Sequence, residues 1–245
     1  MLFENPFIYF PHKGGVGKSP AEDVFLTASD GVRLHGWYAR APGRRPTLLW
    51  FHGNAGNLED RREMFLRLRD LPAGVFLLDY RGYGRSEGKP SEEGLHRDAR
   101  AAWDWLAART PPDRIVVFGK SLGSAPACEL ASRVRCGGLI LQSAFTSAPD
   151  MAHRVLPLFP ARWFMRTKFD NLSRIPRIAC PKLILHSRSD EIVPFEMGER
   201  LFSAAADPKE AAWFDGAGHN DLWIVHERAY YGRLAQFLDR CAGVP

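Results

Sequence analysis

Short apolar runs alternate with amphipathic stretches over most of the chain. The runs end in glycine, polar or acidic residues, and they cover residues 47–53, 75–80, 114–119, 138–143, 182–187 and 211–214. Continuous apolar strands of this kind are typical of a sheet that is buried on both faces. Upstream, residues 23–39 alternate in polarity around Asp30 and Gly31, which predicts a hairpin of two strands.

The stretches between these runs have helical periodicity. Residues 91–109 place apolar side chains at helical spacing, and residues 222–240 are predicted to form a last helix of the same kind. Repeated alternation of strand and helix predicts an α/β fold with a mostly parallel, doubly wound sheet flanked by helices. Ligands bind such sheets beyond the carboxyl ends of the strands, so the chemistry is expected there.

Length and composition favour a single domain. The chain has 245 residues, of which 45% are hydrophobic and 25% are charged, as in an ordinary globular protein. We expect an N-terminal lead-in segment over 1–21 and one domain over 22–245, with a short cap inserted over 148–180. The formal charge of +5 is mild and scattered, which argues against a nucleic-acid partner.

Cysteine spacing and hydropathy indicate the compartment. The four cysteines are 8, 44 and 61 residues apart and match neither a zinc site nor a C-x-x-C motif, so a reducing cytoplasm is expected. Cys136 and Cys180 each come two residues before a strand and are expected to be neighbours, either bridged or as free thiols. No run of 18 apolar residues occurs, so no integral membrane segment is expected; the N-terminal aromatics are expected to pack on the domain, with peripheral attachment to a membrane surface as the alternative.

Residues 119–123, Gly-Lys-Ser-Leu-Gly, follow a predicted strand and precede a helical stretch. This is the context of the G-x-S-x-G nucleophile elbow, in which a sharp turn holds the serine hydroxyl above the sheet. Such a turn leaves no room for side chains on either side, which accounts for the glycines. Ser121 is the predicted nucleophile, and an ordinary strand-to-helix turn is the alternative.

A serine hydroxyl needs a neighbouring base to take its proton. His219 lies on a glycine-rich loop between the final strand and the final helix, from which it can reach the elbow. His35 and His226 fall inside a predicted strand and helix, and His186 ends a strand, where we interpret it as a packing or lining residue. His219 is therefore the predicted general base.

The carboxylate that orients the histidine should follow a strand between the nucleophile and the base. Asp190 does so, with Glu191 as the adjacent alternative and Asp170 as a more distant one. The resulting order of serine, aspartate and histidine is that of the α/β-hydrolase fold.

Acyl transfer builds negative charge on a carbonyl oxygen, which backbone N–H groups can stabilise. The N–H of Leu122 follows the nucleophile at a helix start and is the first predicted donor of this oxyanion hole. The N–H of Asn54, in the glycine-rich turn after the strand 47–53, is the second.

The predicted cap, residues 148–180, is apolar and basic. Met151, Leu156, Phe159 and Trp163 are predicted to contact an acyl substrate, although packing in the core accounts equally well for them. The cap contains six basic residues and two acidic ones. The basic residues are Arg154, Arg162, Arg166, Lys168, Arg174 and Arg177, and the acidic residues are Asp150 and Asp170. This excess favours a carboxylate, a phosphate or an anionic membrane near the entrance.

Residues 13–19 imitate the phosphate-binding loop of MinD-like ATPases. A Walker A loop needs glycine where His12 stands, and Pro20 with a strand-like stretch follows where a helix should begin. The sequence therefore argues against nucleotide binding.

Several stretches resemble a known group of serine hydrolases, the α/β-hydrolase domain-containing proteins of types 17 and 13. The similar stretches are HGNAGN, DYRGYGRSEGKPSEEGL, GKSLGS, FDNLSRI and GAGHNDL, and they span about residues 22–240. The resemblance implies the α/β-hydrolase fold and an esterase or thioesterase activity; type 17 members remove palmitate from protein cysteines. The sequence has no cysteine-rich N-terminal segment like the one that anchors type 17 members, so the acyl group stays open.

These observations predict hydrolysis of an ester or thioester through an acyl-enzyme, with a small-molecule or acylated substrate and no metal or other cofactor. A serine peptidase of the aminopeptidase kind would use the same triad, and a non-catalytic binding module is the alternative from another class.

Overall fold

The computed structural model describes residues 5–15, 17–158 and 160–243. In this part of the chain eight strands form one sheet, in the order β1-β2-β4-β3-β5-β6-β7-β8. The strands are β1 (Glu22–Thr27), β2 (Arg33–Ala39), β3 (Thr47–Phe51), β4 (Gly74–Asp79), β5 (Ile115–Lys120), β6 (Gly138–Gln142), β7 (Lys182–Ser187) and β8 (Lys209–Phe214). β1 pairs with β2 and β2 with β4 in antiparallel fashion, and the other pairs are parallel. The predicted hairpin and doubly wound sheet are confirmed.

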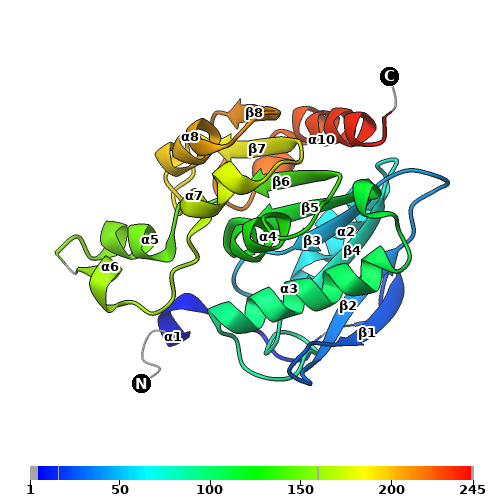
Figure 1. The fold of residues 1–245 in the computed structure, drawn as a ribbon, viewed down its shortest axis with the longest axis horizontal. Coiled ribbons are helices and arrows are strands. Elements are labelled where there is room, and N and C mark those ends of the chain that lie inside the picture. Colours follow the sequence, from blue (N-terminus) through cyan, green and yellow to red (C-terminus); the bar gives the residue numbers. More distant parts are fainter. Residues whose placement is uncertain (1–4, 16, 159, 244–245) are drawn as a thin grey trace.

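Helices cover both faces of this sheet (Figure 1). One face packs against α3 (Glu92–Ala107), α4 (Ser124–Ala131) and α8 (Phe195–Ala204), and the other against α2 (Arg62–Arg69) and α10 (Glu227–Cys241). In β3, Leu49 and Phe51 join the first layer while Leu48 and Trp50 join the second. Both sides of the strand are buried, which is the physical reason for its continuous apolar run.

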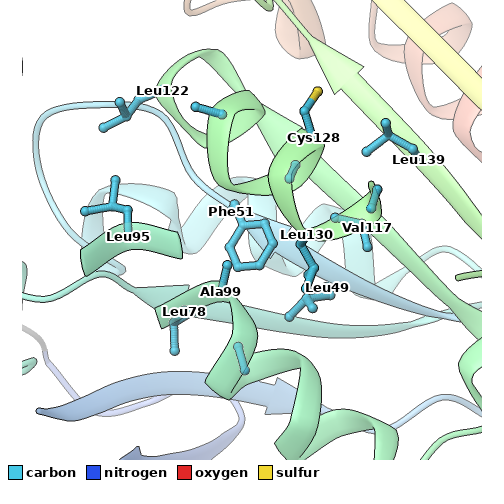
Figure 2. Close-up of a cluster of buried hydrophobic side chains, with 14 of the residues drawn as sticks. Leu49, Phe51, Leu78, Leu95, Ala99, Val117, Leu122, Cys128, Leu130 and Leu139 are labelled. Atoms are coloured by element: carbon cyan, nitrogen blue, oxygen red, sulfur yellow. The ribbon is translucent and has the colours of Figure 1, made fainter. Parts of the chain in front are cut away.

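The first layer is a dense apolar core beneath the elbow (Figure 2). Leu95 and Ala99 of α3 lie beside Phe51 and Leu49, and Leu130 of α4 packs from the neighbouring helix. α3 begins at a cap in which the Ser91 side chain accepts a hydrogen bond from the Gly94 N–H. This cap satisfies a backbone donor that the helix leaves free at its start.

The chain between β6 and β7 forms α5 (Ala148–Val155), α6 (Ala161–Phe164) and α7 (Asn171–Arg174). α7 returns to the body, where the Asn171 side chain donates to Ser124 Oγ and to the Phe145 carbonyl, both at 3.0 Å. α5 and α6 stand apart from the sheet at one side of the molecule (Figure 1).

The other short α-helices of the described residues are α1 (Asn5–Ile8) and α9 (Leu222–Val225). The prediction of one last helix over 222–240 is wrong in one respect: His226 separates α9 from α10. Its imidazole lies 2.8 Å from the carbonyl of Asp215, on the loop that leads to the helix. This contact holds the break in place.

Cys136 and Cys180 are neighbours, as expected. Their Sγ atoms are 3.4 Å apart and the thiols are free. No helix of the described residues is long and apolar enough to cross a membrane.

Candidate active site

Ser121 occupies a sharp turn between β5 and α4. Its φ is +51°, a left-handed conformation that a residue other than glycine rarely adopts. A side chain at Gly123 would fall on the carbonyl of Phe51, and one at Gly119 would overlap the backbone of the same turn. Both positions therefore require glycine, because other backbone atoms approach them too closely for a side chain. The turn places the Ser121 hydroxyl at the carboxyl end of the sheet.

His219 and Asp190 converge on this hydroxyl from the loops after β8 and β7. His219 Nε2 lies 3.0 Å from Ser121 Oγ, and His219 Nδ1 lies 2.9 and 3.0 Å from the two oxygens of Asp190. The carboxylate and the imidazole are both buried. The structure thus brings the three predicted residues into one hydrogen-bonded chain.

The two alternative carboxylates lie elsewhere. Glu191 accepts the backbone N–H of His219 at 3.0 Å and so supports the loop rather than the ring. Asp170 caps α7 by accepting the N–H of Ser173. Only Asp190, of these three acids, has its carboxylate at the imidazole.

Asp190 has further hydrogen-bond donors. The N–H groups of Ile192 and Val193 donate to Oδ1 at 3.0 and 2.8 Å. His186 Nε2 lies 3.4 Å from Oδ2 and 3.0 Å from the Val193 carbonyl. Because both of these neighbours are acceptors, Nε2 of His186 carries the proton.

Two opposing effects set the charge state of Asp190. Burial alone would raise its pKa, but the hydrogen bonds from His186, His219 and Val193 outweigh burial and hold the pKa well below the usual range. The carboxylate is therefore ionised at neutral pH. The sequence predicts a packing or lining role for His186; its spacing of four residues from Asp190 is the one signal that links the two residues.

The turn after β3 passes beside the nucleophile. A Cβ placed on Gly53 would lie 3.5 Å from Cβ of Ser121, so the next residue, Asn54, stands at the mouth of the elbow. The Leu122 N–H follows Ser121 at the start of the helical turn 121–123. Both predicted oxyanion donors thus belong to backbone segments that flank Ser121.

The Asn54 side chain fixes this turn. Its Oδ1 accepts from the Phe10 N–H at 3.1 Å and from the Tyr83 hydroxyl at 2.9 Å, and its Nδ2 donates to the Ile8 carbonyl at 2.6 Å. Arg61 donates to the carbonyls of Asn54 and Ala55 at 3.2 and 2.7 Å. The chain before β1 is thus part of the support for the site.

The same N-terminal segment contains the loop that imitates a phosphate-binding motif. Pro11 forms a bridge with Gly56, and Lys13 forms one with Gly84. Gly14 donates its N–H to the Gly84 carbonyl at 2.9 Å, and the next regular element is a strand, β1, rather than a helix. Gly14 thus takes part in pairing with the loop at Gly84, and the Gly17 N–H donates to the Glu59 carboxylate at 3.1 Å.

A buried pair behind the turn was not predicted. His52 Nε2 lies 3.3 Å from Asp79 Oδ1, and His52 Nδ1 lies 2.7 Å from the Gly53 carbonyl. Both side chains are fully buried, and burial raises the pKa of Asp79. The signal for this pair is the presence of HGN and DYRGYG at the ends of the adjacent strands β3 and β4.

Lys120 was also missed. Its side chain is buried, and its Nζ lies 3.5 Å from Oδ1 of Asn220, the residue after His219. Burial lowers the pKa of Lys120 to about 8. Lys120 occupies the first variable position of G-x-S-x-G, and nothing in the sequence indicates that its side chain is buried.

Three of the four predicted substrate-contacting residues lie in the described part of the chain, and they differ in exposure. Met151 is half-buried and packs on the core, whereas Leu156 is 57% and Trp163 is 87% exposed, so packing in the core is wrong for these two. Phe159 lies outside the described residues. A hollow of about 440 Å³ at the base of α5 is lined by Ser147, Pro149, Asp150, Lys168, Asp170, Leu172 and Ser173. Met151, Leu156 and Trp163 are not among these lining residues.

No metal site is evident in the residues described. Among them, no group of three or more histidine, cysteine, aspartate or glutamate side chains could hold an ion.

Comparisons with known proteins agree with this architecture. A family model described as alpha/beta hydrolase fold matches residues 46–167. The chain is 38% identical to the alpha/beta hydrolase domain-containing protein WAV2 of Arabidopsis thaliana, over 99% of this chain and 89% of that protein. It is 35% identical to alpha/beta hydrolase domain-containing protein 17B of Homo sapiens, over 90% of this chain and 76% of that protein. The fold of the Pyrococcus furiosus esterase Pf2001 is similar, with a TM-score of 0.78 at 22% identity over 95% of this chain and 97% of that chain.

Proposed function

The chain belongs to the α/β-hydrolase family, as its motifs predicted, and on that premise we propose that it is a serine hydrolase that cleaves esters or thioesters. The observation that carries the proposal is the hydrogen-bonded chain from Ser121 Oγ through His219 to Asp190. A strained serine with an imidazole at hydrogen-bond distance and an ionised carboxylate behind it is the arrangement that activates a hydroxyl.

In the proposed reaction, Ser121 Oγ attacks the carbonyl carbon of the substrate while His219 Nε2 takes the hydroxyl proton. The charged Asp190 then stabilises the imidazolium and keeps Nδ1 protonated. His219 gives the proton to the leaving alcohol or thiol, and an acyl group remains on Ser121. Water, deprotonated by His219, releases the acid and restores the serine.

The oxyanion of each tetrahedral intermediate is assigned to the N–H groups of Leu122 and Asn54. The support is positional, since the two segments flank Ser121. Donors fixed before the reaction stabilise the developing charge without reorganisation, and one such donor typically contributes about 3 kcal/mol. The bonds from Asn54 to the N-terminal segment and from Arg61 to the turn would hold that donor still.

Steady-state hydrolysis of a substrate panel tests the proposal. The panel holds p-nitrophenyl esters of increasing chain length, a palmitoyl thioester and an aminoacyl p-nitroanilide. We expect turnover of esters and thioester above the anilide, and a loss of about 10⁶-fold in kcat for Ser121→Ala. Ser132→Ala, which removes a hydroxyl that only bonds the Glu129 carbonyl at the end of α4, is the matched control and should keep full activity. Preferred cleavage of the anilide would instead identify a peptidase.

A further inference from the structure

A part of the cap presents apolar side chains to solvent. We call residues 151–169 the cap arm; it holds most of α5 and all of α6. Leu158 is fully exposed, Trp163 is 87% exposed, and Val155, Leu156 and Phe164 are exposed on the same arm. A single exposed apolar residue is ordinary on a protein surface, but five within ten residues of sequence mark an interaction site.

The charge of the cap arm is of one sign. It contains four Lys and Arg residues and no Asp or Glu, a formal charge of +4 over nineteen residues: Arg154, Arg162, Arg166 and Lys168. The side chains of Arg154 and Arg166 are exposed. They lie at the two ends of the apolar segment and so flank it along the chain.

The shape of the cap arm also restricts the kind of partner that it can bind. α5 and α6 project from one side of the molecule (Figure 1), and prolines at 157 and 160 divide the segment between them. A protruding apolar tip with a tryptophan and flanking cations is the pattern of an element that enters the headgroup region of an anionic bilayer. In a symmetric dimer formed through the arm, the same basic surface would face itself, and the like charges would repel.

We propose that the cap arm docks this protein on anionic lipid bilayers, with Leu156, Leu158 and Trp163 inserted among the lipids and Arg154 and Arg166 on the headgroups. The occupant is a bilayer surface because apolar insertion and cation contacts are both available on one projecting arm. Docking of this kind is independent of hydrolysis and does not rest on the proposed function.

Docking would also orient the molecule. The chain leaves β6 at Gln142 and enters α5 at Ala148, and β6 is the neighbour of β5, whose end carries Ser121. The arm is therefore connected to the carboxyl end of the sheet, where the triad lies. A docked molecule would hold the carboxyl end of its sheet close to the bilayer, where acyl chains are concentrated.

Vesicle flotation tests the proposal on the full chain. Vesicles of phosphatidylcholine alone are compared with vesicles containing about 30% phosphatidylglycerol. We expect binding to the anionic vesicles that weakens as salt is raised. The double variant Leu158→Ser with Trp163→Ser should reduce the bound fraction at least tenfold, and Arg154→Ala with Arg166→Ala should reduce it on anionic vesicles.

The control variant is Leu66→Ser, which removes an exposed apolar side chain on α2 and should bind as the wild type does. Circular dichroism and thermal midpoints verify that the variants are folded. The proposal is overturned if the wild type floats with neither kind of vesicle, or if the double variant binds as the wild type does. It is also overturned if the wild type self-associates through the arm in sedimentation velocity, with vesicle binding absent.

Discussion

At the scale of single residues, the charge of Asp190 is decided by what surrounds it. Donors from His219, His186, Ile192 and Val193 converge on one buried carboxylate, and together they outweigh the cost of burial. In the proposed mechanism this ionised group holds His219 in the tautomer that can accept the Ser121 proton.

Replacing Asp190 should therefore remove most of the activity and leave the fold largely unchanged. For Asp190→Asn we expect kcat to fall by about 10⁴-fold, because an amide no longer selects the useful tautomer of His219. Glu191→Gln keeps an acceptor for the His219 backbone N–H and should stay within about tenfold of wild type. Ester hydrolysis by the two variants measures this difference. Equal losses of kcat in both variants, or full activity in Asp190→Asn, would show that Asp190 is not the carboxylate that orients His219.

Lys120 should make the stability of the protein depend on alkaline pH. Its pKa is lowered to about 8 in the folded chain and is about 10.4 when unfolded. Between these values the unfolded chain binds more protons, so stability rises with pH by up to about 3 kcal/mol. In Lys120→Met this rise should be absent, and the variant should gain most relative to wild type below pH 8.

Urea unfolding of both proteins from pH 7 to pH 10 measures this difference, and groups common to both cancel. Lys89→Met, at an exposed position, is the control and should follow the wild type at every pH. Parallel curves for wild type and Lys120→Met would show that the Lys120 ammonium is not penalised by burial.

Sequence could predict the residues whose chemistry has a motif and an order along the chain. Ser121 follows from G-x-S-x-G in its context, and His219 from its loop. His186 and Lys120 have no such motif: His186 has only its spacing of four residues from Asp190, and Lys120 meets Asn220, a hundred residues away, only in the folded chain.

At the scale of elements, the turn after β3 depends on the N-terminal segment. The two are joined through the Asn54 side chain and through the bridge between Pro11 and Gly56. These contacts join residues more than forty positions apart by single hydrogen bonds. No local periodicity marks them, so the sequence of residues 1–21 does not predict this contact with the site.

Asn54→Ala tests this support, because it keeps the backbone N–H and removes the side-chain bonds to Ile8, Phe10 and Tyr83. We expect kcat to fall by about 10²-fold with little change in KM, since a loosened oxyanion donor acts in the transition state. Asn5→Ala removes a bond to the Pro90 carbonyl in the same segment and should leave kcat within about twofold. A change confined to KM in Asn54→Ala would contradict the assignment.

The strands β3 to β7 were predictable because both of their faces are buried, which forces continuous apolar runs, whereas the hairpin of β1 and β2 was predictable from its alternating polarity. The last helix was predicted as one piece because its apolar spacing continues across His226. The break there comes from a contact between His226 and the loop at Asp215, which helical periodicity does not record.

At the scale of the whole molecule, one buried ion network joins three parts of the fold. Arg81 Nε donates to Asp98 of α3 at 2.9 Å, and its terminal nitrogens donate to Asp30 of the hairpin turn at 2.7 and 3.0 Å. Arg81 and Asp98 are buried. The motif DYRGYG thus carries a link between the β-hairpin, the loop after β4 and α3.

Arg81→Met should lower the free energy of unfolding by about 3 to 5 kcal/mol, because it leaves the buried Asp98 carboxyl without its charged hydrogen-bond partner. Arg100→Met removes an exposed ion pair with Asp104 on the same helix and should cost less than about 0.5 kcal/mol. Urea unfolding at neutral pH compares them. Equal, small losses would mean that the network does not hold the parts together.

In the proposed mechanism Ser121 is a nucleophile that His219 activates. A fluorophosphonate reacts with a serine only when its hydroxyl is activated in this way, and mass spectrometry of the labelled protein locates the adduct. We expect one adduct on the wild type, at Ser121, and none on Ser121→Ala or on folded His219→Ala. An unlabelled wild type, or an adduct that persists in Ser121→Ala, would contradict it.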